Sequence, residues 1–305
     1  MNRILSRKLG WNVLWLGLVL GWGGAAGTVE LVDDLGVPVS LEAPPQRIIS
    51  LAPSNTELVF ALGLGPRLVG VTDVCNYPPQ ASDIDKVAGY NYVNIEEIVA
   101  RKPDLVLAIR GNDMEGVQLL RQQGIPVFAF EIQSVEQTLS SIGRLGQLAG
   151  VEAVADSLQK ALQKRLDMVA AQVDTAASRP RIMWGYWGET IYTAGSDTFI
   201  DDVFHRAGGD NVGGKAPGAW PQVSLEALVD WAPQIVITTY LPKGGDMNQE
   251  LVQLRQRSGW QLLPAVRDGR VYHVDGDLLL RPGPRVIDAL EQIATMVRAS
   301  QVPSP

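Results

Sequence analysis

The sequence predicts an α/β protein of two Rossmann-like lobes that are joined by a single long α-helix, with a ligand cleft between the lobes. Three observations lead to this prediction. Short apolar runs alternate with helical patterns, which is typical of buried parallel strands covered by helices. A helix-and-strand unit occurs twice, 130 residues apart. One long amphipathic stretch separates the two copies.

The N-terminal lobe is expected to span residues 28–150. It should begin with a hairpin over 28–41 that turns at Asp33–Gly36, because an Asp-Asp-Leu-Gly turn lies between two short apolar runs. A helix should open at Pro53 and end before Gly63. Buried strands are predicted at 47–52, 68–72, 105–109 and 127–130.

The helix predicted over 151–177 should bridge the lobes. Its apolar residues recur every three or four positions and form one stripe, at Val151, Val154, Leu158, Leu162, Leu166, Val169 and Val173. The C-terminal lobe is then expected over 178–305, with strands at 181–184, 235–239 and 270–274 and a closing helix at 284–300.

The repeated unit reads NIEEIV at 94–99 and SLEALV at 224–229, and each copy is followed by a proline and a buried strand. Asn94 and Ser224 are suited to cap the two helices, which should end before Pro103 and Pro233. Equivalent offsets in the two copies indicate two lobes of similar architecture.

The N-terminus has the pattern of a secretory signal over residues 1–27: basic residues, an apolar run and then small residues. Cys75 is the single cysteine and lies far from this segment, so we expect a chain in the periplasm without a lipid anchor. The formal net charge of −7 argues against nucleic acid as a partner.

No catalytic or metal-binding constellation is found in the sequence. The two histidines, His205 and His273, do not form a zinc-binding spacing. We therefore expect a binding protein, not an enzyme, with no catalytic residues and no metal site.

Aromatic and charged residues near the ends of predicted strands are candidates for ligand binding. Tyr90, Tyr186, Trp187 and Trp220 would offer flat faces to a bulky ligand, or would fill the core instead. Arg281, on a loop stiffened by proline and glycine, could meet an anionic or amide-bearing ligand, with Asp277 nearby.

Glu96 and Glu226 occupy the first turns of the two repeated helices. A carboxylate is favoured there by the helix dipole whatever its function. Equivalent glutamates on two lobes would also suit a two-fold membrane partner that carries two basic pockets.

Four segments together resemble the class of periplasmic binding proteins that serve ABC importers of cobalamin, ferric siderophores and haem, and most closely its cobalamin-binding members. These segments are RIISLAPSNTE at 47–57, YPPQA at 77–81, the first repeat, and WPQVSLE at 220–226. The resemblance covers nearly the whole chain after residue 27. It implies one bridging helix, docking of Glu96 and Glu226 on the importer, and cobalamin contacts from Tyr90, Tyr186, Trp220, Asp277 and Arg281.

The chain departs from the cobalamin-binding members at four of their ligand positions. Tyr90 stands in place of a tryptophan, and Val74, Ile109 and Leu280 stand in place of a tyrosine, a tryptophan and a glutamate. We expect a monomer that binds cobalamin or a related corrinoid and delivers it to a dimeric permease with its ATPase subunits. A ferric siderophore or haem carrier is the alternative, and haem would need an iron ligand such as Tyr90 or His205. A metal-ion carrier or an enzyme on the same fold is less favoured.

Overall fold

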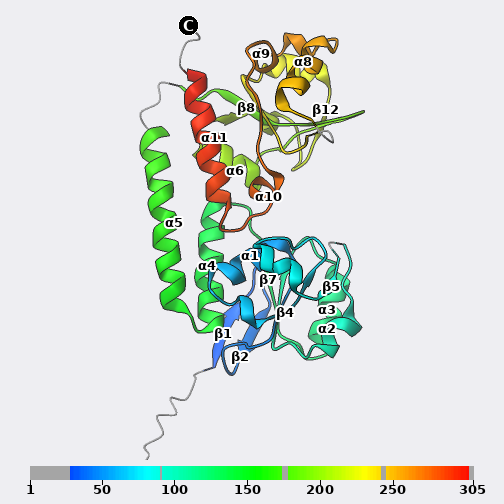
Figure 1. Ribbon diagram of the computed structural model, residues 1–305, viewed down its shortest axis with the longest axis vertical. Coiled ribbons are helices and arrows are strands. Elements are labelled where there is room, and N and C mark those ends of the chain that lie inside the picture. Colours follow the sequence, from blue (N-terminus) through cyan, green and yellow to red (C-terminus); the bar gives the residue numbers. More distant parts are fainter. Residues whose placement is uncertain (1–27, 90, 174–177, 242–244, 302–305) are drawn as a thin grey trace, which may run out of the picture.

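The computed structural model describes residues 28–89, 91–173, 178–241 and 245–301, which form two α/β lobes stacked along the long axis of the molecule (Figure 1). A long helix, α5, runs beside the stack and connects the lobes. The predicted fold class is therefore confirmed. The predicted signal segment, residues 1–27, lies outside the described residues, and the lobe boundaries at 28–150 and 178–305 stay predictions.

The N-terminal lobe is built on a five-stranded sheet in which every pairing is parallel, in the order β5-β4-β3-β6-β7. The strands are β3 (Ile48–Ser50), β4 (Leu68–Thr72), β5 (Lys86–Ala88), β6 (Leu105–Ile109) and β7 (Val127–Phe130). The helices are α1 (Pro53–Ala61), α2 (Ile95–Ala100), α3 (Met114–Gln122) and α4 (Val135–Ala149). All four predicted strands are present, whereas β5 was not predicted.

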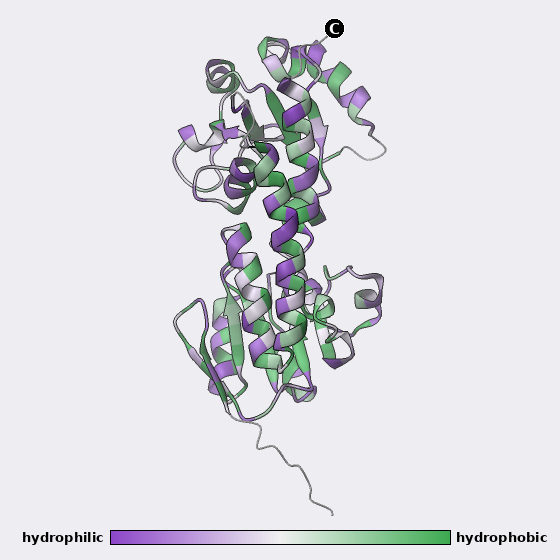
Figure 2. Cartoon of the chain, turned by 90° about the vertical axis from the view of Figure 1, so that its left-hand side faces the viewer, coloured by the Kyte–Doolittle hydropathy of each residue, from purple (hydrophilic) through white to green (hydrophobic). Residues whose placement is uncertain are grey.

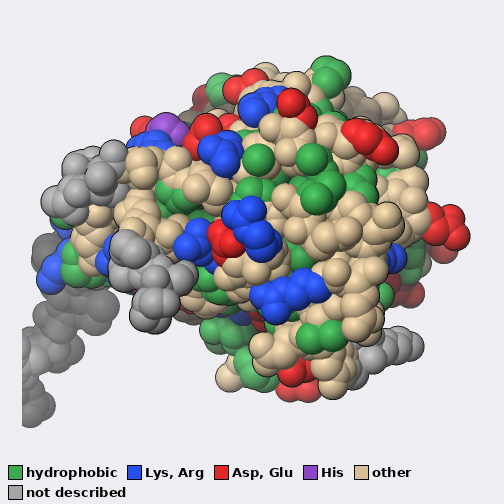
Figure 3. Space-filling view, turned by 90° about the horizontal axis from the view of Figure 1, so that it is seen from above, with side chains coloured by type: hydrophobic (Ala, Val, Ile, Leu, Met, Phe, Trp, Pro, Cys, Tyr) green, Lys and Arg blue, Asp and Glu red, His purple; other side chains and the backbone are tan. Residues whose placement is uncertain are grey.

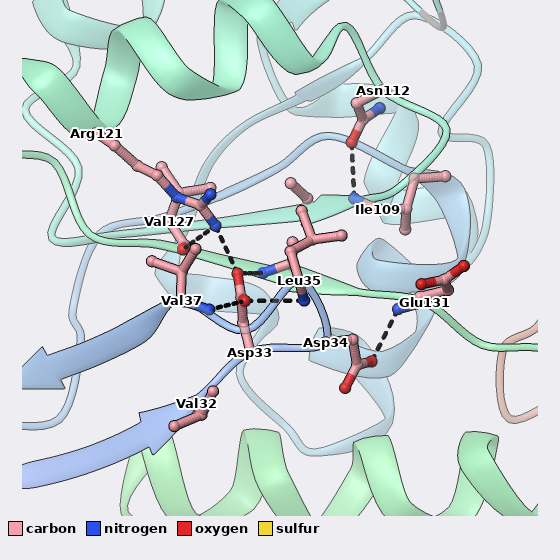
Figure 4. Close-up of polar contacts among 12 residues, drawn as sticks. Val32, Asp33, Asp34, Leu35, Val37, Ile109, Asn112, Arg121, Val127 and Glu131 are labelled. Atoms are coloured by element: carbon pink, nitrogen blue, oxygen red, sulfur yellow. Dashed lines mark hydrogen bonds and ion pairs between the residues drawn. The ribbon is translucent and has the colours of Figure 1, made fainter.

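The hairpin of β1 (Val29–Val32) and β2 (Pro38–Leu41) is tied to β7 through its turn (Figure 4). The buried carboxylate of Asp33 accepts hydrogen bonds from the backbone N–H groups of Leu35, Val37 and Ala129 and from the guanidinium of Arg121. Asp34 forms an ion pair with Arg144 and accepts from the Glu131 N–H. The predicted turn is thus also an anchor for the hairpin.

The bridging helix α5 spans Glu152–Val173, about 33 Å at 1.5 Å per residue. Residues 174–177 of the predicted helix lie outside the described residues. Ala155, at 1% exposure, packs against Gly146 of α4, while Val154 of the predicted stripe is 46% exposed. The apolar face is therefore rotated by one residue at this end, and Figure 2 shows hydrophilic residues along the outer side of the helix.

The C-terminal lobe carries a four-stranded parallel sheet in the order β11-β8-β13-β14. Its strands are β8 (Arg181–Trp184), β11 (Asp210–Asn211), β13 (Ile235–Thr238) and β14 (Val271–His273). Its helices are α6 (Phe199–Arg206), α7 (Leu225–Trp231), α8 (Met247–Gln256), α9 (Pro264–Arg267), α10 (Gly276–Leu279) and α11 (Val286–Gln301). A small antiparallel sheet, which was not predicted, joins β9 (Tyr186–Trp187), β10 (Ile191–Tyr192) and β12 (Gln222–Val223).

The two repeated units form equivalent hydrogen bonds in addition to having the same sequence pattern. Asn94 and Ser224 each accept from a backbone N–H three residues later, at 3.2 Å in both cases. The residue before each repeat proline, Lys102 or Ala232, has φ of 48°. An arginine at the start of the neighbouring strand, Arg47 or Arg181, donates to the end of each helix. Each lobe therefore contains one copy of the same helix-to-strand unit.

The largest cluster of buried apolar side chains draws members from both lobes and from α5. It includes Leu105 of β6, Ile235 of β13 and Leu162 of α5. Two further clusters cover the opposite faces of the two parallel sheets. The lobes are consequently joined by shared apolar packing as well as by the bridging helix.

Candidate functional site

The candidate site lies where the carboxyl ends of the N-terminal strands meet the segment around α10 of the other lobe. Ligands of open parallel sheets bind at this edge as a rule. An inter-lobe cavity of about 340 Å³ is lined there by Ala52, Pro53, Ser54, Val74, Ile109, Gly276, Asp277, Leu280, Arg281 and Pro282. A second cavity of about 300 Å³ shares Ile109 and Pro282 and adds Arg110, Gly111, Phe130, Glu131 and Ile132. We refer to these two cavities, which share lining residues, as the cleft.

One wall of the inter-lobe cavity is aliphatic. Val74, Ile109 and Leu280 line it, and these are the residues that depart from the cobalamin-binding pattern. Ile109 is held at the end of β6 because its N–H donates to the side chain of Asn112 at 2.8 Å (Figure 4). Asn112 in turn donates to the carbonyl of Leu51. The wall can therefore contact an apolar ligand surface with little rearrangement.

The charged end of the inter-lobe cavity contains Asp277 and Arg281, which form an ion pair at 2.7 Å. Both residues also form hydrogen bonds with the side chain of Asn76, which belongs to the opposite lobe. The Nδ2 group of Asn76 donates to the Asp277 carboxylate at 2.9 Å, and the Arg281 guanidinium donates to Oδ1 of Asn76 at 2.6 Å. Asp277 and Arg281 are brought together as predicted. Asn76 was missed because its partners are about 200 residues away in the chain.

The ends of the C-terminal strands carry an exposed aromatic group. Trp220 is 53% exposed and packs edge-on against Trp184, with ring centroids 5.6 Å apart. Tyr186 is 41% exposed and packs in the same way on Tyr240, at 5.5 Å. Tyr240 was not among the predicted binding residues. It lies two residues after β13, as Tyr186 lies two residues after β8, and this equivalent position in the sequence could have identified it. Such faces suit a flat ligand.

Trp187 lies on the other side of β9 from Tyr186, because successive side chains of a strand point to opposite faces. Its indole N–H donates to Glu250 at 2.8 Å, and its ring packs on Trp260 in the interior of the C-terminal lobe. The structure therefore separates Trp187 from the exposed aromatic group and gives it core packing, the alternative weighed for these rings. Tyr90 lies outside the described residues.

Glu96 and Glu226 are exposed in the first turns of α2 and α7. The pKa of Glu226 is lowered by hydrogen bonds from its own backbone N–H and from the Ser224 hydroxyl. The lowered pKa means that the Glu226 carboxylate stays charged to a more acidic pH than an ordinary glutamate does.

None of the helices in the described ranges combines the length and the hydrophobicity that a membrane span requires. In the same ranges, no three His, Cys, Asp or Glu side chains are grouped so that they could hold a metal ion. Figure 3 shows basic and acidic side chains interspersed on the end of the C-terminal lobe.

A family model, related sequences and solved structures all relate this chain to periplasmic binding proteins. The family described as periplasmic binding protein matches residues 48–278. An uncharacterised ABC transporter substrate-binding lipoprotein of Bacillus subtilis, YvrC, is 33% identical over 88% of this chain and 85% of its own. The vitamin B12-binding protein of Vibrio cholerae is 31% identical over 85% of this chain and 91% of its own.

Solved structures of the same class superimpose on most of the chain. The periplasmic vitamin B12-binding protein BtuF of Vibrio cholerae gives a TM-score of 0.74 at 30% identity, over 85% of this chain and 99% of that one. The periplasmic heme-binding protein RhuT of Roseiflexus gives 0.74 at 23% identity, over 84% and 99%. With its two lobes, bridging helix and inter-lobe cavity, the chain belongs to the periplasmic binding protein family.

Proposed function

We propose that this protein is the periplasmic substrate-binding component of an ABC importer and that its ligand is cobalamin or a related corrinoid. The inter-lobe cavity carries the proposal, since it combines an aliphatic wall with the polar groups of Asp277 and Arg281. A corrin ring has apolar faces and a rim of amides, and amides are hydrogen-bonded by carboxylates and guanidinium groups. The similarity to vitamin B12-binding proteins over most of the chain supports this ligand class.

Aromatic side chains are proposed to flank the ligand. Tyr90, which lies outside the described residues, is proposed as a contact from the N-terminal lobe on the resemblance alone. The exposed side chains of Trp220 and Tyr186 would contact the ligand from the C-terminal lobe. Trp187 would support the antiparallel sheet beneath them through Trp260 and Glu250. The reaction is binding and release, with no covalent step.

Titration with cobalamin, haem and a ferric hydroxamate tests the ligand. We expect cobalamin to quench the tryptophan fluorescence of the purified protein and to saturate at one ligand per chain, because the half-exposed indole of Trp220 is proposed to contact the ligand. Quenching by haem or the hydroxamate with no response to cobalamin would reject the corrinoid and retain the transport role.

Trp220→Ala should weaken cobalamin binding by about 10- to 30-fold, a typical effect of truncating an aromatic anchor. Trp220→Phe should keep most of the affinity because a flat face remains. Leu262→Ala, which truncates a 60% exposed residue on the segment before α9, is the matched control and should bind as the parent does. Isothermal titration measures all three, and equal affinities throughout would remove Trp220 from the site.

Haem is the second candidate, favoured by the half-exposed phenols of Tyr186 and Tyr240 and by the heme-binding structural neighbours. A tyrosine phenolate can ligate haem iron. His205 is a less suitable ligand because it lies on α6, beside cavities lined by Leu166 and Leu290 or by Asp201 and Asp202, away from Ile109 and Arg281. A tyrosinate-to-iron absorption band that is lost in Tyr240→Phe would favour haem.

Glu96 and Glu226 are proposed to dock the protein on its permease. We expect Glu96→Ala with Glu226→Ala to leave ligand affinity unchanged and to reduce uptake severalfold, because both carboxylates are exposed and line neither cavity of the cleft. Glu97→Ala with Asp230→Ala removes two other exposed acids from the same helices and serves as the control. Uptake by the first pair equal to that of the control pair would refute the docking role.

Export through residues 1–27 and release without a lipid anchor are also proposed. One relative is named a lipoprotein, so anchoring is the competing arrangement. Intact mass of the protein recovered from the periplasmic fraction distinguishes the two: the proposal requires cleavage near residue 27 and no added acyl mass.

A further inference from the structure

A buried ion pair crosses between the lobes beside the cavity. Glu57, in α1 of the N-terminal lobe, is only 3% exposed at its side chain, and Arg285 precedes α11 of the C-terminal lobe. Arg285 donates through Nε to Glu57 Oε2 at 2.8 Å and through Nη2 to Oε1 at 2.6 Å. This two-bond geometry fixes both distance and orientation. We call the Glu57–Arg285 pair the inter-lobe clasp.

The clasp is supported on both sides. The guanidinium carbon of Arg285 lies 3.6 Å from the ring centroid of Tyr77, which also belongs to the N-terminal lobe. Gly283 approaches α1 so closely that a Cβ there would lie 3.2 Å from Glu57 Oε2. Pro282 and Pro284 restrict the backbone on either side of this glycine. The segment 281–285 thus lies against the other lobe as a stiff loop.

The clasp is distinct from the polar groups of the cavity. Asp277 and Arg281 line the cavity, so a ligand can take over the hydrogen bonds that they make with Asn76. Neither Glu57 nor Arg285 is among the residues that line the cleft cavities. Separating the two would leave an unpaired charge in a buried position, which is strongly disfavoured. The clasp should therefore persist whether or not a ligand is present.

We propose that the Glu57–Arg285 clasp sets the separation of the lobes in the ligand-free protein, so that the cleft is already shaped for its ligand. Glu57 and Arg285 are positioning residues under this proposal. A cleft that is pre-shaped loses less conformational freedom on binding. The effect on affinity rests on the proposed function, whereas the effect on lobe separation does not.

Distance measurements on the ligand-free protein test the clasp. Spin labels at Gln118→Cys on α3 and Gln253→Cys on α8 are exposed and report on the two lobes, and the single native thiol, Cys75, is buried. Pulsed electron paramagnetic resonance should give a narrow distance distribution for the parent and a broader, longer one for Glu57→Gln. Asp34→Asn, which alters an ion pair inside the N-terminal lobe, should match the parent. A parent-like distribution in folded Glu57→Gln would overturn the proposal.

A double variant separates lobe positioning from simple stability. Glu57→Gln with Arg285→Gln leaves no stranded charge, so its melting temperature should exceed that of Glu57→Gln while its distance distribution stays broad. A narrow distribution in this folded variant would also overturn the proposal, even if Glu57→Gln itself fails to fold. If only about one tenth of the variant molecules keep the lobe separation that is able to bind ligand, cobalamin affinity should fall about tenfold. Failure of the parent to bind cobalamin would reject the ligand and leave the distance result standing.

Discussion

Replacing Asp33 with alanine is expected to lower the free energy of unfolding by about 3–5 kcal/mol, the range for breaking a buried ion pair. The Asp33 carboxylate is buried and accepts from three backbone N–H groups and from Arg121. Its loss would strand the guanidinium of Arg121, whose Nε already lacks a hydrogen-bond partner. Urea unfolding followed by circular dichroism measures the change as a lower midpoint at an unchanged slope.

The neighbouring aspartate provides the control for this prediction. Asp34 is about a quarter exposed in its ion pair with Arg144, so Asp34→Ala should cost only about 1 kcal/mol. Adding Arg121→Met to Asp33→Ala removes the stranded charge and should restore part of the stability. Equal losses for Asp33→Ala and Asp34→Ala would show that charge burial is not the cause.

Gly195→Ala is expected to disturb stability and ligand binding together. A Cβ on Gly195 would lie 2.0 Å from the carbonyl oxygen of Gly218, and the Gly195 N–H donates to Ala219 at 2.9 Å. The added methyl must displace the 218–219 backbone, which leads directly into Trp220. We expect a loss of about 1–3 kcal/mol in stability, as for other overpacked sites, and an affinity for cobalamin about tenfold lower, equivalent to about 1.4 kcal/mol.

Gly188→Ala is the matched control because the same methyl group there would meet nothing within 4 Å. It lies in the turn between β9 and β10 of the same small sheet, where Gly188 N–H donates to the carbonyl of Thr190. Thermal melting and isothermal titration of both variants check the prediction. If Gly188→Ala binds cobalamin as weakly as Gly195→Ala, the close approach to Gly218 is not the cause.

Much of the fold could be predicted because its parallel strands are continuous apolar runs. The segments at 68–72, 105–109 and 127–130 coincide with β4, β6 and β7. The two-residue strands β9, β10 and β12 are too short for a hydrophobic period to develop, so the antiparallel sheet was missed. On α5, the predicted apolar stripe places Val154 on the buried face, but Ala155 is the residue that is buried. Close packing against Gly146 favours the smaller side chain at this position.

The candidate site could be predicted only where residues lie close in sequence or in equivalent positions. Asp277 and Arg281 are four residues apart, and their ion pair follows from that spacing on one short segment. Asn76 and Tyr77 reach their partners across the lobes, and no local pattern reports such contacts. Tyr186 and Trp187 point to opposite sides of β9, so a shift of one residue decides which ring is exposed and which ring packs on Trp260.

The turn that carries Asp33 and Asp34 has a consequence for how molecules of this protein behave in a crowded compartment. β7 is the last strand of its sheet, and such a strand can recruit a strand from a second molecule and start aggregation. Here Asp33 and Asp34 accept from the Ala129 and Glu131 N–H groups, while Asp34 N–H and Arg121 donate to the carbonyls of Ala129 and Val127. The two aspartates that hold the hairpin in place therefore also remove a template for intermolecular strand pairing.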